Sequence, residues 1–292
     1  MFRPQLDPPE YIVMDGYPER FQTALASGID EARSFLGNFG PVRVYVFGEP
    51  GEDEASRQAL NDVAESYCRA RRETALPGFE EDCLDGPAKR LVEVAASGGQ
   101  EAFLSAVIFT DPPFAELIFI NADHWGVSDL PLRGIHEYTH VFQQAHRESP
   151  GWLMEGGAVF FEAWLGSERG WVDFPQAMKR SMQSAQTGRS AGRGLKDMEY
   201  TRDLPGEMEP FHRSIAYDMG VWAVTFIIAH SETASIESYR DEFYRLLQEH
   251  GWRVAVAEYS RTSDIDEFYQ QFDEFLAIPL QEQMKLLENI QR

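Results

Sequence analysis

The chain has 292 residues, with 26 basic and 48 acidic side chains and a formal net charge of −22. A charge of this sign would repel phosphate groups, which argues against a nucleic acid or an anionic membrane as a partner. The hydrophobic content of 43% is that of a globular protein large enough for one two-lobed domain or two small ones.

No stretch approaches the roughly 18 consecutive apolar residues of a membrane span, so no transmembrane segment is expected. The first residues lack the apolar region of a signal peptide, which predicts a cytoplasmic protein for the chain as given, or an exported one if it was trimmed. Cys68 and Cys83 are the only cysteines, and their spacing fits no zinc pattern. Both a helix-to-loop disulfide and two buried free thiols are compatible with it.

Residues 1–125 are predicted to form an α/β lobe. Four prolines make residues 1–18 an extended lead-in, with a short strand around Tyr11. Helices are expected over residues 19–36, 54–74 and 87–96, a loop over 76–86, and strands over 41–47, 103–110 and 116–121.

A metal-binding helix pair is predicted over residues 126–185. The sequence His136-Glu137-Tyr138-Thr139-His140 is a His-Glu-x-x-His motif, in a helix expected from Leu130 to Arg147. On an α-helix, positions i and i+4 lie on one face, so both imidazoles can reach one zinc ion at about 2.0–2.1 Å. Glu137 points about 100° away, where it can contact a water on the metal without being a ligand.

A catalytic zinc needs a third protein ligand and one open position. After Pro150-Gly151, a second apolar helix is expected to fold back, and Glu155 lies in its first turn on the side facing the histidines. A carboxylate in such an apolar stretch is costly unless it is paired or bound to metal. The alternative is a solvated first-turn glutamate stabilised by the helix dipole.

The rest of the chain separates into a loop and a helical lobe. Residues 174–184 favour a helix, and residues 186–210 are predicted as a mobile surface loop, rich in glycine, serine and charge over 186–206. Residues 211–292 are predicted to be a mostly helical C-terminal lobe, with helices over about 212–229, 236–250 and 252–259. A final helix opens with a capping box at Ser263-Asp264.

The His-Glu-x-x-His motif, followed by Trp152-Leu153-Met154-Glu155-Gly156-Gly157-Ala158, resembles the gluzincin zinc metallopeptidases, the clan of thermolysin and the membrane-alanyl aminopeptidases. The chain is most similar to the small peptidase-MA-like branch, and the resemblance is strong over about residues 130–165. It implies a zincin-like α+β fold, in which the N-terminal lobe has a small twisted mixed sheet and the C-terminal lobe is mostly helical. It also implies one zinc ion per chain, held by His136, His140 and Glu155, with Glu137 as the general base.

The resemblance extends more weakly to Tyr217-Asp218-Met219-Gly220, where the clan has a tyrosine that stabilises the oxyanion. Tyr217 is the expected donor, His212 competes for the role, and a tyrosine buried against another partner is the alternative. In zincins an edge strand above the metal helix binds the substrate backbone, and residues 117–121 are the candidate, with an internal core strand as the alternative. Glu162 is a further candidate, as an acceptor that orients a ligand histidine.

The chain departs from the larger aminopeptidases because it lacks their Gly-x-Met-Glu-Asn element, so aminopeptidase specificity is not supported. These expectations describe a zinc-dependent metallopeptidase that cleaves a peptide or protein substrate. The alternatives are a non-catalytic zincin-like binding or regulatory protein and a different fold with a chance motif. Neither the oligomeric state nor the choice between endo- and exopeptidase action follows from the sequence.

Overall fold

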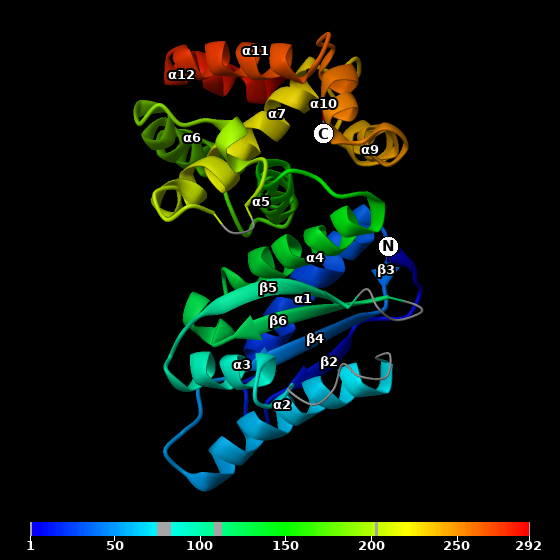
Figure 1. Cartoon of the computed structure of the whole chain (residues 1–292), viewed down its shortest axis with the longest axis vertical. Coiled ribbons are helices and arrows are strands. Elements are labelled where there is room, and N and C mark those ends of the chain that lie inside the picture. The colour runs from blue at the N-terminus through cyan, green and yellow to red at the C-terminus, as the bar shows by residue number, and fades with distance from the viewer. Residues whose placement is uncertain (1, 75–82, 108–112, 202–203, 292) are drawn as a thin grey trace. The chain divides into compact units, whose positions relative to one another are not determined.

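The computed structural model describes residues 2–74, 83–107, 113–201 and 204–291 (Figure 1). Over these residues the protein is α+β and mostly helical, with a small mixed sheet, which confirms the broad fold class. The chain divides into two compact units, Met1–Ala145 and His146–Arg292. Within the described ranges, no helix has both the length and the apolar character needed to cross a bilayer.

The first unit contains a four-stranded sheet with the strand order β2–β4–β6–β5. β2 (Glu10–Val13), β4 (Val42–Phe47) and β6 (Phe114–Ile120) are parallel, and β5 (Glu101–Val107) pairs antiparallel with β6. The register pairs Val13 with Val46 and Phe47 with Ile120. The carboxyl ends of the three parallel strands therefore lie almost level with one another. β1 (Arg3–Pro4) and β3 (Phe39–Gly40) form a separate antiparallel pair.

The expectation that residues 117–121 form an edge strand is wrong. β6 pairs with β4 on one side and with β5 on the other, and every residue from Phe114 to Ile120 is buried. A continuous apolar run is typical of a strand that is covered on both faces, whereas an edge strand open to water alternates. Among the described strands, β5 is the edge on that side of the sheet.

Helices cover both faces of this sheet (Figure 1). α2 (Glu54–Thr74) and α3 (Pro87–Ala96) pack on one face, against Tyr45, Phe47, Ile118 and related core residues. α1 (Glu19–Leu36) lies on the other face. The bounds of these three helices confirm the predicted ones.

α4 (Leu130–His146) lies against α1 and follows a short helix, η1 (Ala122–Trp125). The two long helices approach so closely that a Cβ on Gly28 would lie 1.9 Å from the Pro131 carbonyl oxygen. Glycine is therefore required at this crossing, which fixes α4 against the sheet-bearing unit.

Cys68 and Cys83 form a disulfide. It links α2 to the residues just before α3, which decides between the two readings of the cysteines. A disulfide that closes a loop of this kind stabilises the fold mainly by restricting the unfolded chain.

The second unit is mostly helical in its described part, and residues 211–292, predicted to be mostly helical, are so. Its helices are α5 (Gly151–Glu168), α6 (Phe174–Ser190), η2 (Leu195–Met198), η3 (Glu209–Phe211), η4 (Arg213–Met219), α7 (Gly220–His230), α8 (Ile236–Ser238), η5 (Tyr239–Phe243), α9 (Tyr244–His250), α10 (Trp252–Ser260), α11 (Ile265–Ala277), α12 (Leu280–Met284) and η6 (Lys285–Asn289). η4 and η5 are π-helices. The predicted cap of the last long helix is confirmed, because the Glu267 amide donates to the Asp264 side chain.

The prediction of a mobile surface loop over residues 186–210 is wrong for its first part. α6 continues to Ser190, and Leu195 and Met198 are buried. Gly188 had suggested a loop, but it allows α6 to approach Ile215 closely. A Cβ at Gly188 would lie 2.8 Å from the Ile215 side chain. A glycine inside a helix can mark such a close approach as well as a break.

Candidate metal centre

His136 and His140 lie on one face of α4, four residues apart as the motif predicts. They are 4% and 9% exposed, and their ring centroids are 5.0 Å apart with the rings nearly perpendicular. Buried imidazoles on consecutive turns of a helix are rigidly placed. They therefore present two nitrogen donors in a fixed relation.

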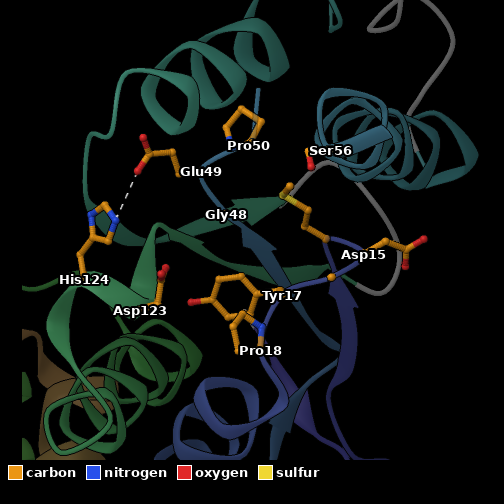
Figure 2. A pocket seen from close by; sticks show the side chains of 12 residues that line it. Asp15, Tyr17, Pro18, Gly48, Glu49, Pro50, Ser56, Asp123 and His124 are labelled. Atoms are coloured by element: carbon orange, nitrogen blue, oxygen red, sulfur yellow. Dashed lines mark ion pairs between the residues drawn. The ribbon is translucent and has the colours of Figure 1, made fainter. Parts of the chain in front are cut away.

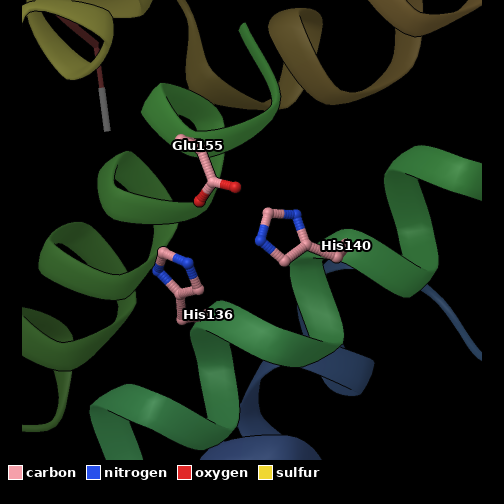
Figure 3. A group of neighbouring side chains, drawn as sticks. All are labelled: His136, His140 and Glu155. Atoms are coloured by element: carbon pink, nitrogen blue, oxygen red, sulfur yellow. The ribbon is translucent and has the colours of Figure 1, made fainter. Parts of the chain in front are cut away.

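Glu155 on α5 joins the two histidines. One ligand atom from each of the three residues lies within 4.8 Å of the others, and Figure 3 shows the carboxylate and both rings directed toward one another. Among the described histidine, cysteine and acidic side chains, these three form the group that lies close enough together to hold one metal ion. Two imidazoles and one carboxylate are a known ligand set for catalytic zinc, so the residues present fit that ion.

Gln143 is a residue beside the candidate site that the sequence did not point to. Its Oε1 lies 2.8 Å from His140 Nδ1, and the amide is buried. Because an amide oxygen only accepts, Nδ1 carries the proton and the Nε2 lone pair is left for a metal. The available signal was its position three residues after His140, one turn along the same helix. The related expectation for Glu162 stays a prediction.

The other polar residues of the motif hold α4 in place. The Tyr138 hydroxyl donates to the Gly37 carbonyl (2.9 Å) and accepts from the Phe39 amide (2.7 Å), which ties α4 to the chain after α1. Burial raises the pKa of Tyr138, so the hydroxyl stays protonated and remains a donor. Thr139 donates to the Ile135 carbonyl within the helix.

Glu137 lies on α4 directly after His136 and before Tyr138, and its side chain is 4% exposed. It is not one of the three residues whose ligand atoms converge. The role of general base expected for Glu137 therefore stays a prediction.

α5 is fixed within the second unit by a contact between two backbones. A Cβ on Gly156 would lie 2.2 Å from the Gly220 carbonyl carbon, and one on Gly220 would lie 2.4 Å from the Trp152 oxygen. Glu155 is therefore next to the point where α5 meets the junction of η4 and α7. Only glycine on both sides allows this approach.

Tyr217 lies in the π-helix η4, three residues before Gly220. Its half-buried ring lies beneath the Arg213 guanidinium, 4.7 Å from the centroid, and 5.5 Å from the His212 ring. The next residue, Asp218, accepts a hydrogen bond from Ser184 on α6 (2.7 Å). π-Helices are rare in proteins, and the role of oxyanion donor expected for Tyr217 stays a prediction.

Comparisons with known protein families, with curated proteins and with solved structures each give no match for this chain.

Proposed function

We propose that the protein is a zinc-dependent metallopeptidase of zincin-like architecture. The observation that carries the proposal is the convergence of His136, His140 and Glu155. A structural zinc site is normally closed by four protein ligands, whereas three protein ligands leave a position open for water or substrate. The resemblance of the motif region to gluzincins supports the same reading.

In this proposal the three residues hold one zinc ion per chain. The ion, when bound, supplies a Lewis acid that lowers the pKa of water and polarises the scissile carbonyl. Glu137 accepts the proton of the attacking water and then delivers it to the leaving amine. Gln143 keeps His140 in the tautomer and orientation that ligation needs. Tyr217 donates a hydrogen bond to the carbonyl oxygen as negative charge develops there.

The substrate backbone needs a place to bind, and the internal position of β6 removes the first candidate. β5 is the edge strand that pairs directly with β6, and β2 is the edge strand on the opposite side of the four-stranded sheet. An exposed strand edge can add an extended peptide through main-chain hydrogen bonds. We therefore assign to β5 the role that was expected of residues 117–121.

The test combines metal analysis with turnover of a broad fluorogenic peptide library. The purified chain is expected to hold about one zinc ion. Glu137→Gln should keep that zinc and lower hydrolysis by about 10²- to 10⁴-fold, because only the proton transfer is lost. Glu148→Gln, an exposed residue just after α4, is the matched control and should leave both unchanged.

Three results would overturn the proposal. Turnover that persists in Glu137→Gln would show that another group is the base. A zinc-loaded chain that cleaves no peptide in the library would favour the non-catalytic zincin-like binding protein. A chain that takes up no zinc, and whose stability ignores chelators, would mean that the motif occurs by chance.

A further inference from the structure

A second polar site lies in the first unit, in a cavity of about 450 Å³ that includes none of the three ligand residues. It is lined by residues 14–18, 48–51 and 123–124, together with Ser56 on α2 (Figure 2). Its volume falls within the range of about 300–1,000 Å³ that is usual for small-molecule sites.

The cavity lies beyond the carboxyl ends of three parallel strands. Residues 14–18 follow β2, residues 48–51 follow β4, and residues 123–124 come soon after β6. Because these strands end almost level, the three connecting segments lie next to one another at the carboxyl end of the sheet. In open α/β sheets, ligands bind in crevices outside the carboxyl ends of the strands.

The charge of the lining favours a cation. Asp15, Glu49 and Asp123 all line the cavity, and the one basic side chain in the lining, His124, lies 3.5 Å from the Glu49 carboxylate. The amino end of α2 does not offer a site for an anion, because Asp53 already accepts from the Ser56 amide (2.9 Å) and hydroxyl (2.7 Å). An acidic concave surface with little positive charge concentrates cations.

Tyr17 Oη and Asp123 Oδ1 are buried atoms of the lining that make no hydrogen bond of normal geometry, and the phenol and the carboxylate interact with each other. Figure 2 shows the Tyr17 hydroxyl directed toward Asp123. Burial and the charge of Asp123 raise the pKa of the Tyr17 phenol, so it stays protonated. A ligand that carries N–H groups could donate to the carboxylate and to the phenol oxygen, and hydrogen bonds to an ionised group are among the stronger ones.

The spacing of the acidic groups favours an organic cation over a metal ion. Among the described residues, His136, His140 and Glu155 form the group that is close enough to hold one metal ion, and Asp15, Glu49, Asp123 and His124 are not part of it. The Tyr17 ring, together with Met14 and Pro50, adds apolar and aromatic surface. Such surface suits an alkyl chain and the face-on approach of an ammonium or guanidinium group.

The site is also organised in advance. Asn121, just before the segment that carries Asp123, has a φ of 48°, and its side-chain amide donates to the Ala95 and Gly99 carbonyls. A Cβ on Gly48 would lie 3.0 Å from the Tyr17 ring, so glycine there lets the ring lie against the end of β4. Rigid placement of this kind lowers the entropy that binding would cost.

We propose that this cavity binds a small organic cation, an alkylammonium or guanidinium compound, with its charged group between Asp123 and Tyr17. This inference does not depend on the proposed peptidase activity, since no residue of the metal centre takes part.

The test is isothermal titration of the full chain with agmatine, which carries both kinds of cationic group, and with n-butylamine. Uncharged n-butanol is the control ligand of similar shape. We expect saturable binding of about one agmatine per chain, weaker binding of n-butylamine and none of n-butanol. Binding should be the same with and without added zinc.

Variants identify the cavity as the place of binding. Asp123→Asn should weaken agmatine binding by about tenfold or more, because a charge-assisted hydrogen bond is lost, and Tyr17→Phe should weaken it by a smaller factor. Glu65→Gln removes one negative charge from the exposed face of α2 and is the matched control, with no expected change.

Several outcomes would overturn the proposal. One is the absence of saturable binding for both amines, and another is equal binding of n-butanol. Equal weakening by Glu65→Gln and Asp123→Asn would show a general charge attraction. Binding of Ca²⁺ that depends on Asp123 and excludes agmatine would make this a metal site.

Discussion

The ligand group on α4 and α5 and the cavity at the ends of β2, β4 and β6 are both polar sites, but they are built from different parts of the fold. His136, His140 and Glu155 are held by regular helices, and their ligand atoms come within 4.8 Å of one another. The cavity draws Asp15, Glu49 and Asp123 from three connecting segments, and these side chains are not part of that group. Helices thus provide the short fixed spacing that one ion needs, whereas strand ends provide the wider spacing that suits an organic molecule.

The largest effect that separates the two sites is expected from Glu155→Ala. Because two histidines alone give an incomplete site, zinc content and peptide hydrolysis should both fall to background. Agmatine binding at the cavity should not change. Zinc analysis and titration of the same sample check both, and Glu258→Ala, an exposed glutamate on α10, is the control. Zinc retained at full occupancy would show that Glu155 is not a ligand.

Tyr217→Phe tests the donor assigned to the second unit. The ring contacts with His212 and Arg213 are kept in phenylalanine, so the fold and zinc content should be unaffected. Loss of one oxyanion donor should lower kcat by about 10²- to 10³-fold with little change in KM. His212→Ala, measured beside it, decides between the two candidates: a large loss only in that variant would transfer the role to His212.

The disulfide of the cavity-bearing unit can be removed by replacing Cys68 and Cys83 together with serine. Releasing a loop of about 15 residues should lower the free energy of unfolding by about 3 kcal/mol. Denaturant unfolding followed by circular dichroism measures the change, with the oxidised parent chain as reference. An unchanged midpoint would mean that the bridge does not restrict the unfolded chain.

Gln143→Ala tests the residue that orients His140. Loss of such an outer hydrogen bond typically lowers metal affinity by about 10- to 100-fold. Competition with a fluorescent zinc chelator measures it. The neighbouring Gln144→Ala is the matched control, because that side chain is exposed. Equal affinities in the two variants would contradict the role of Gln143.

The helix-borne site could be predicted from the sequence because helical periodicity turns spacing into geometry. The interval from His136 to His140 is enough to place two imidazoles on one face. The bounds of α1 are equally readable, since Pro18 precedes the helix and Gly37, with a φ of 96°, follows it.

The rest of the site and fold depends on contacts between distant segments, for which the sequence has no local pattern. The cavity joins Asp15 to Asp123, more than a hundred positions apart, through the pairing of β2, β4 and β6. The position of β6 inside the sheet depends on β5 pairing beside it, and the continuation of α6 depends on Gly188 packing against Ile215. Hydrophobic pattern alone does not distinguish these arrangements.

The glycine pair at Gly156 and Gly220 has a consequence for redesigning the second unit. The backbones of α5 and of the η4–α7 segment are in direct contact at these two glycines. A close-packed contact of this kind transmits a displacement of one segment to the other. A displacement of Glu155 would therefore carry Tyr217 with it. A redesign that aims to move Glu155 or Tyr217 alone therefore has to change α5 and the η4–α7 segment together.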